Sequence, residues 1–260
     1  MPRSSVSSPV DSVLDVIGRT PCVRLRKVVP EGCADVYVKL EYLNPTGSYK
    51  DRMARAIVEE AERRGDLKPG MRVVEATGGS TGSSLAFVCT LKGYGFRAVC
   101  SNAFAAEKLR TMAAFGADVD IVYSPTGKIT PDLFPKMVER ARTLAEEDKN
   151  GIVGYKSLGQ ELLAQFPQGI DAFCGATGGA GMIMGTATVL KASDPKTRVV
   201  VLEPESSPVI TKGHGGTHGV EGISPGFFPP LLDESLYDEA RGISEEEARK
   251  MCRRLEPQLD

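Results

Sequence analysis

The chain has 260 residues, of which 41% are hydrophobic and 25% charged, and its formal net charge is -2. Such a composition is typical of a globular protein with one large domain or two modest ones. Charges of both signs are interspersed, so no basic face indicates a nucleic acid partner, and no apolar run reaches the roughly 20 residues that span a bilayer. The first residues lack the apolar core of a signal peptide, so we expect a cytoplasmic protein.

Short β-branched runs alternate with segments of helical periodicity along the chain. The predicted strands are residues 35–41, 72–77, 97–102, 118–124, 169–175 and 198–204. The predicted helices are residues 51–65, 81–95, 105–117, 131–150 and 181–193. Several of the strands are apolar on both faces, which is typical of a parallel sheet covered by helices on both sides. The pattern therefore predicts an α/β fold with a mostly parallel sheet, whose ligands lie where strands lead into helices.

Cysteine and histidine do not indicate a metal site. The six cysteines form no CxxC motif and mostly lie in apolar runs, so we expect buried free thiols. His214 and His218 lie in a glycine-rich stretch, which does not hold two imidazoles on one face. The same stretch belongs to a long irregular segment, residues 213–233, whose phenylalanines and prolines predict a packed loop.

Lys50 is the most informative residue of the first strand-to-helix junction. The sequence KLEYLNPTGSYKDR, residues 39–52, places it directly after a turn, and Ser48 with Asp51 forms a capping-box pattern for the helix that follows. A cation is disfavoured in a first helical turn, which lowers the pKa of an amine, and Schiff-base chemistry requires a neutral amine. A solvated lysine paired with Asp51 or Glu41 is the alternative.

Two further junctions are rich in glycine. The stretch EATGGSTGSS, residues 75–84, offers N–H groups and hydroxyls that suit a carboxylate or a phosphate, although a tight turn alone also explains it. The stretch CGATGGAGMIMG, residues 174–185, lacks both the Walker pattern and the GxGxxG spacing, but it fits a monophosphate. A reactive lysine, a carboxylate site and a monophosphate site together indicate pyridoxal phosphate.

These stretches carry a resemblance over nearly the whole chain. IGRTPCVRL, KLEYLNPTGSYKDR, EATGGSTGSSLAF, GATGGAG, VLEPESSPV and HGVEGISPGFFPPLLD resemble, in this order, the cysteine synthase (O-acetylserine sulfhydrylase) branch of the fold-type II pyridoxal phosphate enzymes, which also includes cystathionine β-synthase. The resemblance implies two three-layer α/β domains. We expect a smaller domain at residues 43–150 and a larger one formed by residues 1–42 and 151–260. A homodimer is implied by the resemblance alone.

The resemblance also implies roles for individual residues. Lys50 binds the cofactor covalently and acts as the catalytic base. The implied phosphate-binding turn is Ala176, Thr177, Gly178, Gly179 and Ala180, and Ser80 lies beside the ring hydroxyl of the cofactor. The implied substrate-binding residues are Thr77, Gly78, Gly79, Thr81 and Gly222. The implied reaction is β-replacement on an O-activated serine such as O-acetylserine, in which sulfide or another nucleophile displaces the leaving group.

The chain departs from the family pattern at four places. Ser80 replaces an asparagine, and Ala180 replaces a threonine that would add a side-chain donor. Around residues 146–155 a Gln-Phe-x-Asn segment that helps to bind substrate is missing, and the sequence ends before the serine that meets the pyridine nitrogen.

Three hypotheses for the function follow. The first is an active β-replacement enzyme that makes cysteine or a related amino acid. The second is an eliminating enzyme of the serine or threonine dehydratase type. The third is a truncated homologue that has lost catalysis and acts through interaction with a partner.

Overall fold

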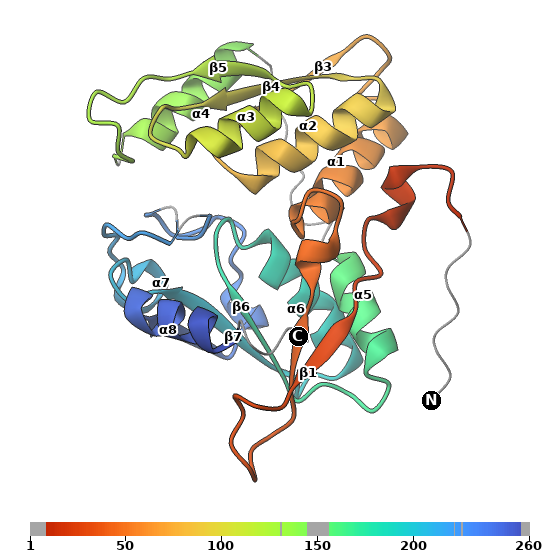
Figure 1. Cartoon of the computed structure of the whole chain (residues 1–260), viewed down its shortest axis with the longest axis vertical. Coiled ribbons are helices and arrows are strands. Elements are labelled where there is room, and N and C mark those ends of the chain that lie inside the picture. Colours follow the sequence, from red (N-terminus) through yellow and green to blue (C-terminus); the bar gives the residue numbers. More distant parts are fainter. Residues whose placement is uncertain (1–8, 131, 145–155, 221, 225, 256–260) are drawn as a thin grey trace.

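Two α/β lobes form the protein. The structure is a computed structural model, and it describes residues 9–130, 132–144, 156–220, 222–224 and 226–255. Each lobe contains a three-stranded parallel sheet, and the lobes lie one above the other in Figure 1. The predicted α/β class with parallel sheets is confirmed. Within the described ranges, no helix is long and apolar enough to cross a membrane.

The upper lobe in Figure 1 carries the sheet β3-β4-β5. Its elements are α1 (Lys50–Arg64), β3 (Arg72–Ala76), α2 (Ser80–Lys92), β4 (Gly95–Cys100), α3 (Ala106–Ala114), β5 (Asp118–Ile121) and α4 (Leu133–Leu144). The predicted end of α1 holds, because Gly65 adopts the left-handed conformation after it, whereas α2 ends at Gly93, two residues before the predicted Gly95.

Apolar side chains cover both faces of this sheet. On one face Val58, Leu85 and Met112 from α1, α2 and α3 pack in one buried cluster with residues of β4. On the other face Leu133 and Met137 of α4 pack against Val99 of β4. The arrangement is three-layered, and burial of each such side chain contributes roughly 1.5–3 kcal/mol to folding.

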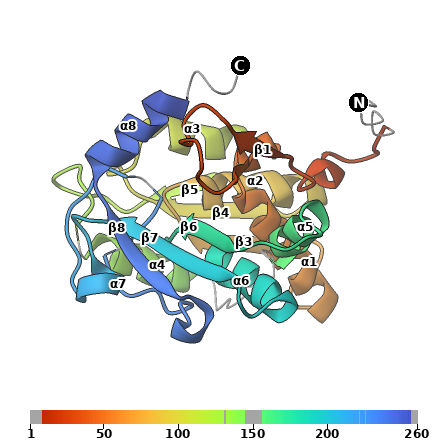
Figure 2. The ribbon, with the colours of Figure 1, turned by 90° about the horizontal axis from the view of Figure 1, so that it is seen from below.

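The lower lobe contains the sheet β6-β7-β8, whose strands run side by side in Figure 2. Its elements are α5 (Lys156–Gln165), β6 (Ala172–Ala176), α6 (Gly181–Ser193), β7 (Arg198–Pro204), α7 (Val209–Lys212), the short 3-10 helix η4 (Glu234–Leu236), β8 (Glu239–Ile243) and α8 (Glu245–Leu255). Ile183 and Met184 of α6 pack on Val199 and Val201 of β7. Helix α8 buries none of its residues and lies on the outside of the lobe in both views.

One predicted strand belongs to a different sheet from the one expected. Strand β2 (Val36–Lys39), from the predicted strand 35–41, pairs antiparallel with β1 (Cys22–Leu25) in a separate two-stranded sheet. It does not join a parallel sheet, and Val36 and Tyr37 are exposed. Apolar composition predicted a strand here, but it does not reveal which strand lies beside it.

The cysteines are only partly as predicted. All six are free, but only Cys89 and Cys100 are buried. Cys22 is intermediate, and the other three are exposed, so the prediction of buried thiols was wrong for most of them. Their runs form short, half-exposed elements rather than core strands.

A group of charged side chains joins the two lobes, and we call Arg52, Glu41, Glu161 and Lys39 the Arg52 cluster. The buried Arg52 guanidinium donates to Glu41 Oε2 at 2.7 Å and to Glu161 Oε1 at 2.7 Å. Lys39 Nζ lies 3.0 Å from Glu161 Oε2. Since Arg52 is on α1, Glu41 precedes α1 and Glu161 is on α5, the Arg52 cluster fixes the chain around Lys50 to the lower lobe.

Gly18 shows how closely this cluster is packed. It adopts the left-handed conformation, and a Cβ there would lie 2.8 Å from both Arg52 Nη1 and Glu161 Oε1. Its N–H donates to Asn44 Oδ1 at 2.8 Å. A side chain at this position would therefore separate the ion pair.

Replacing Arg52 should destabilise the fold far more than replacing its neighbour Arg55. Arg52→Met leaves Glu41 and Glu161 without their main donor, so we expect a loss of about 3–5 kcal/mol in the free energy of unfolding. Arg55 makes a more exposed pair with Glu59, so Arg55→Met should cost about 1 kcal/mol or less. Urea unfolding of both variants measures the difference, and equal losses would contradict the central role of Arg52.

The cluster also predicts acid sensitivity. Burial alone would raise the pKa of Glu161, but hydrogen bonds from Arg52, the Arg19 backbone and Lys39 outweigh it and lower the pKa from 4.5 to about 2. A depressed carboxyl pKa gives stability that is complete above pH 4.5 and is lost as the pH falls through about 2. We expect Glu161→Gln to reduce this acid-induced loss, which is measured as the free energy of unfolding against pH. Glu59→Gln, which changes the exposed partner of Arg55, is the control and should leave the loss unchanged.

Candidate active site

Lys50 is the first residue of α1. Its side chain is half-buried, and Nζ lies 4.8 Å from the centre of the Tyr49 ring. Burial lowers the pKa of Lys50 from 10.5 to about 8. A larger share of the amine is therefore neutral near pH 7 than for an exposed lysine, as predicted for a nucleophile or base.

The predicted capping box at Ser48 and Asp51 forms differently from the expectation. The Ser48 hydroxyl accepts from Lys50 N at 3.1 Å, and Tyr49 is the N-cap residue, so Ser48 lies one position too early. The Asp51 carboxylate instead accepts from Thr46 N at 2.8 Å and Thr46 Oγ1 at 2.5 Å. The turn before the helix is one residue longer than the capping box assumes.

Glu41 and Asp51, the alternative partners of Lys50, bind other donors. Glu41 accepts from Arg52 and from Thr20 Oγ1, the latter at 2.5 Å. Asp51 accepts from Thr46 and from Ser84 Oγ, the latter at 2.6 Å. The alternative in which Lys50 pairs with Asp51 or Glu41 on the surface is therefore not favoured.

The predicted substrate loop, Thr77–Thr81, connects β3 to α2. Thr77 Oγ1 accepts from Gly82 N at 3.1 Å, which closes the loop over the first turn of the helix. A Cβ at Gly78 would lie 2.3 Å from the Phe104 ring, so only glycine fits there. Helix α2 begins at Ser80 after Gly79, which has no side chain to cap it, and Thr77 Oγ1 accepts from the third N–H of the helix. Its first N–H groups are thus suited to an anion.

The predicted phosphate turn, Ala176–Ala180, has the same character. Ala180 precedes α6 in the left-handed conformation with a φ of 66°, and α6 has no side-chain cap among the described residues. Thr177 is buried, and its hydroxyl has no hydrogen-bond partner in the part of the chain that the structure describes. An orphaned hydroxyl beside an uncapped helix end indicates a missing anionic ligand.

Gly222 lies directly behind this turn. A Cβ at Gly178 would lie 2.9 Å from Gly222 O, and Ser224 N donates to Thr177 O at 2.8 Å. Ser224 itself is buried and has a φ of 45°, an unusual conformation for a residue other than glycine. In the described residues of the predicted packed loop 213–233, the backbone thus supports the phosphate turn.

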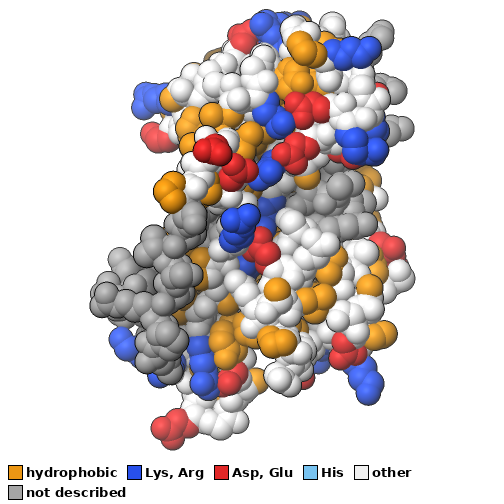
Figure 3. Space-filling model, turned by 90° about the vertical axis from the view of Figure 1, so that its right-hand side faces the viewer, with side chains coloured by type: hydrophobic (Ala, Val, Ile, Leu, Met, Phe, Trp, Pro, Cys, Tyr) orange, Lys and Arg blue, Asp and Glu red, His pale blue; other side chains and the backbone are white. Residues whose placement is uncertain are grey.

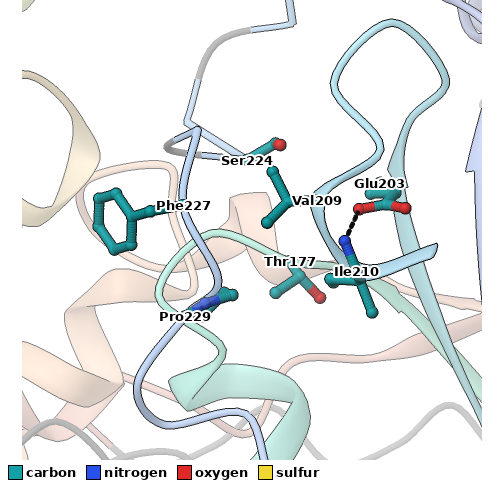
Figure 4. A pocket seen from close by; sticks show the side chains of 7 residues that line it. All are labelled: Thr177, Glu203, Val209, Ile210, Ser224, Phe227 and Pro229. Carbon is teal, nitrogen blue, oxygen red and sulfur yellow. Dashed lines mark hydrogen bonds between the residues drawn. The ribbon is translucent and has the colours of Figure 1, made fainter. Parts of the chain in front are cut away.

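A small pocket opens where these segments meet, and Figure 4 shows the side chains around it. It is lined by Thr177, Glu203, Val209, Ile210, Ser224, Phe227 and Pro229. The Glu203 carboxylate accepts from Ile210 N at 2.8 Å and from Thr211 N at 2.9 Å. It therefore holds the start of α7 in place.

The structure assembles the predicted residues in two groups. A bond between Asp51 and Ser84 joins Lys50 to the helix of the substrate loop, and backbone contacts join the phosphate turn to Gly222. Ser80 lies at the start of α2, within the first group. Residues 146–155, where the resemblance implied that a substrate-binding segment is missing, lie outside the described residues. Sequence reasoning missed Ser84 and Ser224, because nothing in their local pattern signals these contacts.

The described residues do not form a metal site, and one face of the molecule carries charges of both signs. Within the ranges given above, no three His, Cys, Asp or Glu side chains gather closely enough to hold a metal ion. Figure 3 shows charges of both signs interspersed on the face that it presents. The geometry instead fits pyridoxal phosphate, which needs an amine and a phosphate site: Lys50 supplies the amine, and the turn Ala176–Ala180 supplies helical N–H groups and the Thr177 hydroxyl.

Comparison with known proteins agrees with this fit. The family model for pyridoxal-phosphate dependent enzymes matches residues 13–257. A cysteine synthase from Staphylococcus aureus is 39% identical over 259 residues, with 95% of this chain and 82% of the relative covered. An O-ureido-L-serine synthase from Streptomyces lavendulae is 36% identical over 252 residues, with 94% of this chain and 77% of the relative covered.

A solved structure gives the same result for the fold. The cysteine synthase of Entamoeba histolytica superimposes with a TM-score of 0.86 at 29% identity, covering 98% of this chain and 79% of that one. Sequence, fold and site thus agree, and the chain belongs to the family of pyridoxal-phosphate dependent enzymes, with pyridoxal phosphate as its cofactor.

Proposed function

We propose that the protein catalyses β-replacement on an O-activated serine such as O-acetylserine, with sulfide or another nucleophile, to give cysteine or a related amino acid. The observation that carries this proposal is the half-buried amine of Lys50, whose helix is bonded to α2 through Asp51 and Ser84. The similarity to a cysteine synthase supports replacement over elimination. Because an O-ureido-L-serine synthase is also similar, the proposal leaves the nucleophile open.

The residues of the chain have distinct tasks in this reaction. When bound, pyridoxal phosphate supplies an electron sink for the carbanion of the amino acid. Ala176–Ala180 would bind its phosphate, and Lys50 Nζ would hold the cofactor. The same amine would remove the proton from the α-carbon of the substrate.

The substrate carboxylate is assigned to the loop Thr77–Thr81, with Gly222 on the opposite side. The first N–H groups of α2 favour an anion through both hydrogen bonds and the helix dipole. Ser80 takes the position beside the ring hydroxyl of the cofactor, where its hydroxyl can donate or accept one hydrogen bond.

The wider organisation is part of the proposal. The two sheets support a smaller domain at residues 43–150 and a larger one formed by residues 1–42 and 151–260. Six free cysteines are compatible with the reducing conditions of the cytoplasm. A homodimer follows from the resemblance to the family.

Replacing Lys50 should abolish the covalent bond to the cofactor. The wild-type protein with added pyridoxal phosphate should show the visible absorbance band of the lysine-bound cofactor, and Lys50→Ala should lack it. Lys92→Ala is the control, because Lys92 is a partly buried lysine that pairs with Glu62. Cysteine should form from O-acetylserine and sulfide with the wild-type and control proteins only. Absence of the band from the wild-type protein would favour a homologue without catalysis.

The lowered pKa of Lys50 can be measured without the cofactor. The rate at which an amine-specific reagent labels Lys50 should rise with pH around a midpoint of about 8. Mass spectrometry of the labelled peptide gives the profile, and a model peptide with an ordinary lysine, whose pKa is about 10.4, is the control. Coinciding midpoints would show that Lys50 is an ordinary surface amine.

A further inference from the structure

Three side chains around Lys50 form a buried hydrogen-bonded group that the reaction described above does not use. We call Asp51, Thr46 and Ser84 the Asp51 cluster. Asp51 has an exposed fraction of 0%, and its carboxylate accepts from Thr46 N at 2.8 Å, Thr46 Oγ1 at 2.5 Å and Ser84 Oγ at 2.6 Å. Thr46 Oγ1 and Ser84 Oγ are themselves 3.2 Å apart. Each hydroxyl donates its single proton to Asp51, so the hydrogen bonds converge on this carboxylate.

A carboxylate at this depth is costly unless donors satisfy it. Burial of an ionised group without partners is strongly unfavourable, and three donors offset that cost. A carboxylate at the second helical position would interact favourably with the helix dipole even if it lay on the surface. The dipole therefore does not explain why Asp51 is buried, whereas its bond to another helix does.

The position of the cluster relates it to the site. Asp51 directly follows Lys50, Thr46 lies in the turn before it, and Ser84 lies on α2, about one turn after the substrate loop. The start of this turn has a separate anchor, because Asn44 donates to Glu41 O at 2.8 Å and accepts from Gly18 N. The Asp51 cluster thus restrains the remainder of the turn and connects it to α2.

We propose that Asp51 is a positioning residue, whose carboxylate sets the place of the Lys50 amine relative to the loop that binds the substrate carboxylate. The inference rests on the proposed function, since it assigns a purpose to the contact between the two loops. Asp51 itself touches neither substrate nor cofactor. It acts by fixing the backbone on both sides of Lys50 to the helix at whose N-terminus the substrate binds.

The decisive variant is Ser84→Ala, which removes one donor from Asp51 and introduces no new polar group. Ser83→Ala is the matched control, because Ser83 is a buried serine at the adjacent position of α2. Asp51→Asn is the stronger change, with Asp66→Asn, an exposed carboxylate paired with Arg64, as its control. Asp51→Asn risks unfolding, so Ser84→Ala decides the matter.

Two measurements separate positioning from general stability. In the cofactor-free protein, hydrogen exchange of the peptide that contains Thr46 and Lys50 should be faster in Ser84→Ala than in Ser83→Ala. In the presence of pyridoxal phosphate, titration of the visible absorbance band should give a dissociation constant about tenfold higher for Ser84→Ala, the consequence of one weakened buried hydrogen bond.

The outcomes are distinct. If the hydrogen exchange and the dissociation constant of Ser84→Ala equalled those of Ser83→Ala, the proposal would be overturned, even if the melting temperature fell. Faster exchange with an unchanged dissociation constant would also overturn it, since the cluster would then only stabilise the fold. If the wild-type protein bound no cofactor, the proposed function would fail, and unchanged exchange in the cofactor-free protein would independently refute the restraint.

Discussion

The ion pairs of Arg52 are the contact on which the rest of the site depends. Arg52 is on α1, two residues after Lys50, and its guanidinium binds Glu41 and Glu161 on separate segments of the chain. Because a planar guanidinium offers donors on several sides, one side chain fixes both segments at once. The helix that begins with Lys50 is therefore anchored to the lower lobe as well as packed in the upper one.

The carboxylates of Glu41 and Asp51, which flank Lys50 in the sequence, are bound by other side chains. Glu41 binds Arg52, and Asp51 binds Thr46 and Ser84, so other donors satisfy these two carboxylates. Burial lowers the pKa of Lys50 to about 8. The shift therefore arises from desolvation of the amine.

Several of these features could be predicted from the sequence, and others could not. The glycine-rich junctions and Lys50 were identifiable because their chemistry depends on local pattern: a strand, a turn and a helix in succession. Strand β8 is short, polar and at the sheet edge, so no periodicity reveals it. The antiparallel partner of β2 and the bond from Ser84 to Asp51 are contacts between distant residues, and a single sequence does not encode them in any local signal.

The N-terminus of α6 links ligand binding to folding. A missing helix cap commonly costs about 0.5–2 kcal/mol, and Ala180 leaves the start of α6 without a side-chain cap among the described residues. An anion that binds there would accept from N–H groups of the first helical turn. Anion binding and fold stability are therefore thermodynamically linked, so the free energy of unfolding should rise with the concentration of the ligand.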